Sequence, residues 1–407
     1  MERPFSRLTV TEKAARSLRG GHPWVYAGEV LTQGDPCPDG AVVDVYSPKD
    51  RWLGAGFYNS RSKIRVRLLS RNTNDRMDEA FFARRVRYAL EYRRQVMGPD
   101  FADCRLIFGE ADGFPGWTLD RFGDVLVSEV LSLGIEQRRD MLYAQVRREL
   151  ENMGVTVRVI YERNESAIRQ KEGLSCGKGP YIAPGLESEP SGETEICENG
   201  IYYNLDYVNG QKTGFFLDQK YNRAAAARIA PGRRVLDCCT HTGAFALNCA
   251  AALAESVTAL DVSADALAQA RRNAERNGLS DKITFVQADM FDYLTDLAAS
   301  RERPYDYIIL DPPAFTKSSA TVEAARRGYR EINRRAMQLL PRGGYLATCS
   351  CSHFMTNELF RAMLMDAAKD ASVSLRQIEE RRQSPDHPIL WGVPETEYLK
   401  FYLFQIV

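Results

Sequence analysis

The first candidate for chemistry is an aspartate followed by two prolines, which lies within the segment Tyr307 to Phe315, YIILDPPAF. The four residues before it are apolar or aromatic, which is typical of a strand buried on both faces of a parallel sheet. Pro312 and Pro313 cannot continue a hydrogen-bonded ladder, so we expect the strand to end at Asp311. Ligands of open α/β sheets bind beyond the carboxyl ends of the strands. Asp311 is therefore predicted at a reaction site, where the stiff Pro312–Pro313 turn holds a flat ligand against Phe315.

Further acids stand where three preceding strands are expected to end. Asp237 closes the segment VLD, Asp261 closes TALD, and Asp289 follows the segment FVQA. The loop after Asp237 contains one glycine, Gly243, and no basic residue, which argues against a dinucleotide and its pyrophosphate. The phosphate-free nucleoside S-adenosylmethionine fits better, with Asp261 on the ribose hydroxyls, Asp289 on the adenine amino group and Met290 against the ring. The predicted cofactor-binding residues at this edge are Asp237, Thr240, Gly243, Asp261, Asp289, Met290 and Asp311. Taken singly, each aspartate has an alternative interpretation as a helix cap.

Two thiols stand at the end of the fifth expected strand, in the segment LATCSCSHFM. Strands four and five should be neighbours, which places Cys349 and Cys351 beside Asp311. Cysteine is also a common buried residue, so packing is the alternative interpretation. A thiolate that adds to carbon 6 of a pyrimidine makes carbon 5 nucleophilic enough to accept a methyl group, which is covalent catalysis. In that reaction Asp311 could hydrogen-bond or protonate cytosine N3.

The elements that must position these residues alternate between strand and helix from residue 201 onward. Two final strands without a helix between them must pair antiparallel or lie apart. Alternating strands and helices predict a parallel sheet, and a terminal antiparallel strand resembles the class I methyltransferases over about half of the chain. The strands are expected at 234–238, 256–262, 282–287, 307–310, 345–351, 372–379 and 398–406, and the helices at 243–252, 265–277, from 291, at 323–340 and at 357–368.

The N-terminal 72 residues predict a small β-rich module. Its last strand alternates four cations with aliphatic residues, so the cations should share one face. That face could contact RNA phosphates or could be an ordinary solvated strand face. The four cations are Arg61, Lys63, Arg65 and Arg67. After it, residues 73–190 predict a middle α+β region with helices at 79–97 and 135–152, and residues 171–200 are expected to form a connecting loop.

Composition limits the remaining possibilities. The chain of 407 residues has 54 Lys plus Arg and 54 Asp plus Glu, so net charge does not indicate nucleic acid. No apolar run approaches the ~20 residues of a membrane span, and the first residues do not resemble a signal peptide. Nine cysteines without paired spacing and four scattered histidines predict neither a disulfide framework nor a metal site. We therefore expect a protein of the reducing cytoplasm.

The segments NGQKTGFFLDQKYNR, LDCCTHTGAF, LDPPAF and SCSHFMT resemble the PUA-domain family of large-subunit ribosomal RNA cytosine-C5 methyltransferases. GHPWVYAGEV near the start and DHPILWGVPETEYLKFYLFQIV at the end extend this resemblance over nearly the whole chain. It implies a PUA RNA-binding domain at 1–72, a middle domain at 73–190 and a catalytic domain at 191–407. It also implies Cys351 as the nucleophile, although a T-C-S pattern would select Cys349, and it adds Lys212, Thr213 and Phe216 to the cofactor-binding residues.

Large-subunit ribosomal RNA is therefore the expected partner, with Pro312, Pro313 and Phe315 near the target base and the basic strand on the phosphates. A homodimer is a further candidate assembly. Three alternatives stay open: methylation of a ring or exocyclic nitrogen, an RNA-binding protein that has the fold without the activity, and a small-molecule methyltransferase. The first needs no thiol, the second would not need acids at four strand ends, and the third would not need about 190 residues of preceding modules.

Overall fold

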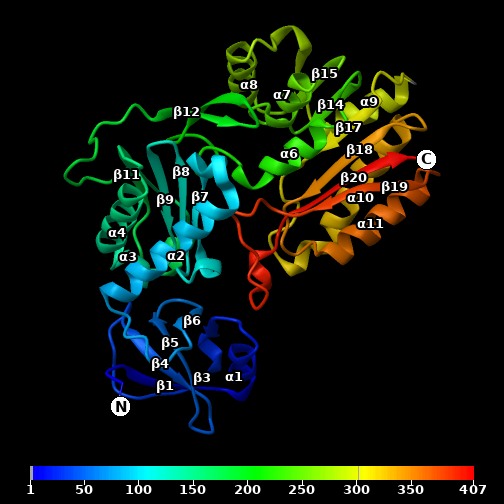
Figure 1. The fold of residues 1–407 in the computed structure, drawn as a ribbon. Coiled ribbons are helices and arrows are strands. Elements are labelled where there is room, and N and C mark those ends of the chain that lie inside the picture. The colour runs from blue at the N-terminus through cyan, green and yellow to red at the C-terminus, as the bar shows by residue number, and fades with distance from the viewer. Residues whose placement is uncertain (1–2, 301) are drawn as a thin grey trace. The chain divides into compact units, whose positions relative to one another are not determined.

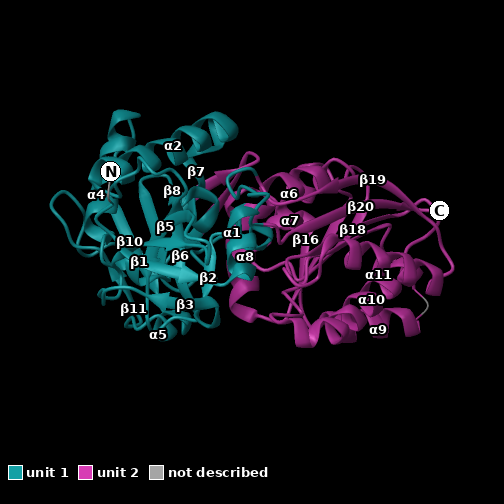
Figure 2. Ribbon diagram, turned by 90° about the horizontal axis from the view of Figure 1, so that it is seen from below, with its two compact units in different colours: residues 1–195, 205–217, 385–396 teal, residues 196–204, 218–384, 397–407 magenta. Residues whose placement is uncertain are grey.

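The chain forms two compact units in the computed structural model, which describes residues 3–300 and 302–407 (Figures 1 and 2). Unit 1 comprises residues 1–195, 205–217 and 385–396, and unit 2 comprises residues 196–204, 218–384 and 397–407. The chain therefore leaves unit 2 after residue 384 and returns to it at residue 397. Within the described residues, no helix combines the length and the apolar character needed to cross a membrane.

Unit 1 begins with a six-stranded sheet in the order β2-β6-β5-β4-β1-β3. Its strands are β1 (Ser6–Val10), β2 (Trp24–Tyr26), β3 (Val30–Gln33), β4 (Val42–Tyr46), β5 (Trp52–Tyr58) and β6 (Ile64–Ser70). Helix α1 (Glu12–Arg19) begins after Thr11, whose hydroxyl accepts a hydrogen bond from Ala14 N. Leu8, Val25 and Val66 pack in the core beside this helix.

A second sheet of unit 1 has the order β11-β10-β9-β8-β7. Its strands are β7 (Asp103–Phe108), β8 (Trp117–Phe122), β9 (Val125–Val130), β10 (Val159–Asn164) and β11 (Gly177–Pro180). Helices α2 (Glu79–Met97) and α4 (Arg139–Asn152) pack against each other, and α3 (Leu133–Glu136) and α5 (Ile168–Lys171) are short. A separate two-stranded sheet pairs β12 (Glu193–Glu198) with β13 (Ile201–Asp206).

Unit 2 is built on a seven-stranded sheet in the order β16-β15-β14-β17-β18-β20-β19. The first five strands are parallel, and β20 is antiparallel to both of its neighbours. The strands are β14 (Arg234–Cys238), β15 (Ser256–Asp261), β16 (Ile283–Gln287), β17 (Tyr307–Leu310), β18 (Tyr345–Ser350), β19 (Leu375–Arg381) and β20 (Lys400–Ile406). The order reverses at β14 and β17, so the ligand crevice of such a sheet is expected beyond the carboxyl ends of these two strands.

Helices cover both faces of this sheet, as Figure 1 shows for unit 2. One face carries α6 (Lys220–Ala227), α7 (Ala244–Ala251) and α8 (Ala264–Arg276), and the other carries α9 (Met290–Ser300), α10 (Val322–Leu339) and α11 (Asn357–Asp370). Successive side chains of β17 pack on opposite faces of the sheet. Ile308 and Leu310 join the core under α10 and α11, whereas the Tyr307 hydroxyl donates to Ala226 O of α6.

The predicted α/β fold with a terminal antiparallel strand is confirmed, as is the pairing of the fourth and fifth strands of unit 2. Two details are wrong. The helix expected at 135–152 is interrupted at Gln137 and Arg138, which separate α3 from α4. The connecting loop expected at 171–200 contains β11 and β12, because the backbone pairing of β11 with β10 and of β12 with β13 overrides its Gly- and Pro-rich composition.

Gly243 yields a stability prediction because it has φ 87° and lies close to α8. A Cβ there would meet Leu247 Cδ1 at 3.0 Å and Ala270 Cβ at 3.1 Å. Gly278 also has a positive φ, 65°, but no atom within 4 Å of its Cβ position. We expect Gly243→Ala to lower the free energy of unfolding in urea by more than the about 1–2 kcal/mol of the left-handed backbone alone, which is the loss expected for Gly278→Ala. Equal losses would contradict the crowding at Gly243.

Candidate active site

The connection from β14 to α7 is a tight loop with three left-handed residues. Cys239 has φ 64°, His241 has φ 51° and Gly243 has φ 87°. Such a backbone costs a non-glycine residue on the order of 1–3 kcal/mol, so the surroundings must hold it. Thr240 N donates to Leu260 O at 2.9 Å, and His241 N donates to Asp261 Oδ2 at 2.8 Å. This loop therefore fixes the ends of β14 and β15 together.

Asp237 and Asp311 are two desolvated acids at the ends of neighbouring strands. Burial raises the pKa of each to about 7, and the negative charge of Asp311 contributes to the shift at Asp237. One oxygen of Asp237, Oδ2, accepts hydrogen bonds from Thr240 Oγ1 at 2.6 Å and from Ala246 N at 3.0 Å. Its buried Oδ1 has no hydrogen-bond partner. An orphaned carboxylate oxygen of this kind fits a cationic or hydrogen-bonding ligand.

Asp218 and Gln219 belong to the same acidic cluster and were not predicted. Asp218 is the charged neighbour that contributes most to the raised pKa of Asp311, and Gln219 Nε2 donates to Asp311 Oδ1 at 3.0 Å. The Tyr398 hydroxyl donates to Asp218 Oδ2 at 2.6 Å, while Asp218 Oδ1 is buried without a partner. The only sequence signal for both was their place in the segment KTGFFLDQ. The cluster thus holds two orphaned carboxylate oxygens.

Asp261 and Asp289 lie at the ends of β15 and β16 as predicted, in different settings. Both oxygens of Asp261 accept backbone hydrogen bonds, from His241 N and from Ser263 N at 2.9 Å, which orients the carboxylate. Asp289 is exposed, and its Oδ1 accepts from Phe291 N at 2.7 Å as a cap of α9. Met290 is buried, with its Sδ 3.9 Å from Cys239 Sγ. The cap at Asp289 occupies Oδ1, and Oδ2 takes no part in it.

The two thiols differ in exposure. Cys349 is fully buried, and its burial together with the negative charge of Asp311 raises the pKa of the thiol well above its ordinary value. Cys351 follows β18, is half-buried, and has its Sγ 4.0 Å from Pro312 O. A thiol must ionise and reach its substrate to act as a nucleophile. The geometry therefore favours Cys351.

Some residues of the turn after Asp311 pack inside unit 2. Pro312 is buried and Pro313 is exposed. The Phe315 ring lies 4.4 Å from the Tyr329 ring and 6.0 Å from the Phe291 ring, between centroids. Phe315 is half-buried, and its predicted stacking against a base stays a prediction.

The three residues added by the family resemblance lie in unit 1, whereas the acids lie in unit 2. Lys212 is exposed with φ 56°, Thr213 is buried, and Phe216 is half-buried. The Thr213 hydroxyl donates to Asp120 Oδ2 at 2.5 Å. Their predicted contact with the cofactor stays a prediction.

The basic strand requires one correction. Arg67 is buried and donates to Glu172 Oε1 at 2.9 Å and to Glu110 Oε1 at 3.4 Å. These carboxylates of unit 1 neutralise its charge, so Arg67 is not available to bind phosphate. The reason is that this end of β6 faces other parts of unit 1 and not solvent. Arg65 is half-buried and donates to Asn59 O at 2.9 Å. Arg61 and Lys63 precede the strand and are exposed.

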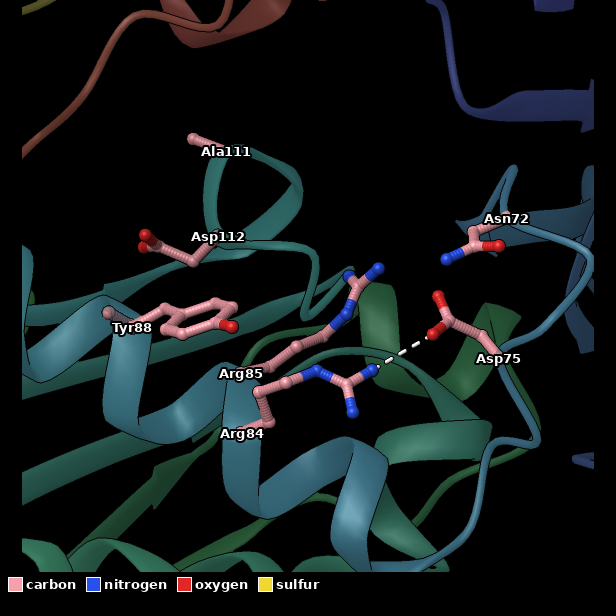
Figure 3. A pocket seen from close by; sticks show the side chains of 8 residues that line it. Asn72, Asp75, Arg84, Arg85, Tyr88, Ala111 and Asp112 are labelled. Carbon is pink, nitrogen blue, oxygen red and sulfur yellow. Dashed lines mark hydrogen bonds and ion pairs between the residues drawn. The ribbon is translucent and has the colours of Figure 1, made fainter.

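A hollow of about 400 Å³ lies elsewhere, in unit 1, and Figure 3 shows its lining. Arg84 Nη2 donates to Asp75 Oδ1 at 2.9 Å, and burial lowers the pKa of the neighbouring Arg85 to about 10. Two arginines and two aspartates line it, and none of the predicted site residues does. Within the described residues there is no group of three or more His, Cys, Asp or Glu side chains placed to hold a metal ion.

Comparison with known proteins agrees with these features. Residues 136–405 match the family described as S-adenosylmethionine-dependent methyltransferase, and residues 8–71 match the PUA-like domain. The chain is 38% identical to "Ribosomal RNA large subunit methyltransferase I" of Klebsiella pneumoniae over 99% of both chains. It is 39% identical to the protein of the same name from Pseudoalteromonas atlantica, over 99% of this chain and 100% of the relative.

A solved structure has the same fold over nearly the whole length. It is a protein from Streptococcus mutans provisionally assigned as a SAM-dependent methyltransferase, with a TM-score of 0.81 at 23% identity, covering 98% of this chain and 99% of the other. The N-terminal sheet is therefore a PUA-like domain, and the seven-stranded sheet is the α/β fold of a methyltransferase whose cofactor is S-adenosylmethionine. The chain belongs to the S-adenosylmethionine-dependent methyltransferase family, in the group whose curated members are named ribosomal RNA large subunit methyltransferase I.

Proposed function

We propose that this protein methylates carbon 5 of a cytosine in large-subunit ribosomal RNA, with Cys351 as the covalent nucleophile. The observation that carries the proposal is the place of Cys351, half-buried at the end of β18 and 4.0 Å from the carbonyl oxygen of Pro312. A thiol beside the Asp-Pro-Pro turn is what a covalent C5 reaction needs, whereas nitrogen methylation needs none. The names of the relatives support ribosomal RNA as the substrate.

The acidic cluster fits the cofactor. S-adenosylmethionine, when bound, supplies an electrophilic methyl group on a sulfonium and carries a second cation on its amino group. The orphaned oxygens of Asp218 and Asp237 would accept the cationic amino acid part, and the oriented carboxylate of Asp261 would accept the ribose hydroxyls. Asp289 and Met290, at the next strand end, would contact the adenine.

In the proposed reaction, side chains of this protein carry out separate steps. The Cys351 thiolate adds to cytosine C6, and the displaced π electrons make C5 the nucleophile that takes the methyl group. A base removes the C5 proton, the C5–C6 double bond reforms, and the thiolate leaves. Asp311, with a pKa raised to about 7, is partly protonated at neutral pH and can donate to cytosine N3, which favours the addition.

RNA recognition is assigned to unit 1. We propose an RNA-binding domain at residues 1–72, a middle domain at 73–190 and a catalytic domain at 191–407. The exposed cations Arg61 and Lys63 of the PUA-like domain would contact phosphates. A target base must be unstacked before a thiol can reach C6, so the substrate is a single-stranded or opened RNA segment.

The nucleophile is tested by incubating the protein with unmodified large-subunit ribosomal RNA and methyl-labelled cofactor, followed by mass spectrometry of the nucleosides. We expect labelled 5-methylcytosine from the wild type, and at least a 1,000-fold slower reaction for Cys351→Ala because the covalent route is removed, on the scale of lost nucleophiles. Cys349→Ala is the matched control and should keep the activity, since that thiol is buried.

Loss of activity in Cys349→Ala alone would assign the nucleophile to Cys349. Label in a nitrogen-methylated base would contradict the covalent mechanism itself. RNA containing 5-fluorocytosine provides an independent readout, because fluorine at C5 cannot leave as a cation. The wild type and Cys349→Ala should be trapped as a protein–RNA adduct that Cys351→Ala does not form.

The acid cluster predicts a pH dependence of stability without cofactor. The pKa of Asp237 is raised from 3.8 to about 7, so the folded protein holds protons that the unfolded chain releases between these values. The stabilisation is complete below the unfolded pKa and is lost as pH rises through about 7. The free energy of unfolding should therefore fall between pH 5 and pH 8, and Asp237→Asn should reduce that fall by at least about 1 kcal/mol. Asp281→Asn, at an exposed position, is the control, and identical slopes for all three proteins would contradict the assignment.

The proposed binding of phosphates by Arg61 and Lys63 predicts a salt effect. Arg61→Ala with Lys63→Ala should weaken RNA binding and reduce the slope of log affinity against log salt by about one for each phosphate that is no longer neutralised. The control removes two exposed lysines of unit 2, Lys282 and Lys369, and should leave the slope unchanged. A slope unaltered by the first pair would exclude these cations from the interface. Affinity is measured by filter binding at several salt concentrations.

A further inference from the structure

Lys400 is a buried cation beside the candidate nucleophile. It begins β20 directly opposite Ser350 of β18, and only 2% of the residue is exposed. Its Nζ donates to Ser352 O at 2.6 Å and to Tyr398 O at 2.8 Å. Because Ser352 directly follows Cys351, the contact with Ser352 O holds the ammonium group at the backbone next to Cys351, whose charge acts on Lys400. An ammonium has three N–H donors, so the two carbonyls leave a third.

The charges around Lys400 leave it without a carboxylate partner. In the described part of the chain, no carboxylate oxygen lies within ion-pair distance of Nζ, 4.0 Å. The charged groups that face it are Cys351 after β18, Arg382 after β19 and Glu397 before β20. Arg382 Nε donates to Glu397 Oε1 at 2.6 Å, and this ion pair neutralises Glu397.

A buried ammonium without a counter-ion is energetically unfavourable, because it has lost its hydration. Burial accordingly lowers the pKa of Lys400 to about 8. Cys351 opposes that shift, since a thiolate would stabilise the ammonium. The stabilisation is mutual by linkage, so the ammonium equally favours the thiolate. Of the two acidic groups among these three, Glu397 is neutralised by Arg382, so deprotonation of Cys351 would supply the counter-charge for the ammonium.

We propose that Lys400 is the proton acceptor and counter-ion of Cys351. The Sγ–H bond breaks, its proton moves to the neutral Nζ, and the resulting ammonium–thiolate pair is the reactive form. When the thiolate adds to its substrate, the ammonium keeps the proton, and it can return the proton to Sγ after elimination. Lys400 thus sets the charge of the nucleophile without touching the base. The role in methylation rests on the proposed function, but the ion pair does not.

The test measures the thiol directly, without RNA or cofactor. The full-length protein is alkylated with iodoacetamide between pH 5.5 and 10, and the modified fraction at Cys351 is followed by fragment mass spectrometry of the tryptic peptide 343–361. The rate reports the thiolate fraction. We expect a wild-type midpoint below the about 8.5 of an ordinary cysteine thiol. Lys400→Gln keeps donors for the two carbonyls but removes the charge, and its midpoint should rise by about one pH unit, a tenfold lower thiolate fraction at neutral pH.

Matched variants separate charge from structure. Lys400→Arg restores a cation and should return the midpoint toward the wild type, which a purely packing role would not require. Lys369→Gln, at an exposed position on α11, should not change the midpoint. Thermal melting identifies a Lys400 variant that does not fold. The wild-type profile tests the proposal even then, because a midpoint at or above about 8.5 overturns it.

Two outcomes distinguish this inference from the function. A raised midpoint in Lys400→Gln supports the ion pair even if neither protein forms 5-methylcytosine, in which case the proposed reaction alone fails. Superimposable profiles for wild type and Lys400→Gln overturn the ion pair even if methylation depends on Cys351.

Discussion

The desolvated carboxyl cluster at the carboxyl edge of unit 2 is the constraint on which the site depends. The charge of Asp218 contributes to the raised pKa of Asp311, and the charge of Asp311 contributes to that of Asp237. One oxygen of Asp218 and one of Asp237 are buried without a hydrogen-bond partner. Such an arrangement is unfavourable in isolation, so rigid surroundings must maintain it. The paired strands β14 and β17, the strained loop after Asp237 and the hydrogen bond from Gln219 provide that support. A cationic ligand would relieve the cluster, which links the stability of the unit to its occupancy.

The parallel sheet was predictable because its strands are short apolar runs that end at acids, prolines or glycines. Asp237, Asp261 and Asp311 follow the strands that the sequence indicated, and the breaker Pro312 stops β17 where expected. Parallel strands bring their carboxyl ends to one edge, so local pattern and topology together were enough to place these acids. The adjacency of Asp311 and the two cysteines followed from the same argument.

Residues that reach the site from distant segments could not be predicted in this way. Asp218 precedes α6 and meets Tyr398, 180 positions later, while Lys400 meets Ser352 across an antiparallel pair. Neither contact leaves a periodic signal in the sequence. The basic strand was mispredicted for a different reason. Only Arg65 and Arg67 of the four cations lie within β6, and Arg67 is paired with Glu110 and Glu172 of the same unit, which only the tertiary structure reveals. Periodicity identifies a face and not what covers it.

The position of β20 in the sheet has a consequence for biosynthesis. This strand lies between β18 and β19 although it follows both in the chain, and residues 385–396 of unit 1 are made before it. The ladder of β18 therefore cannot be completed until residues 400–406 leave the ribosome. The edge of β18 next to Cys351 stays unpaired while about fifty further residues are synthesised. The strand edge beside Cys351 is therefore covered only after the other strands of the sheet have been made.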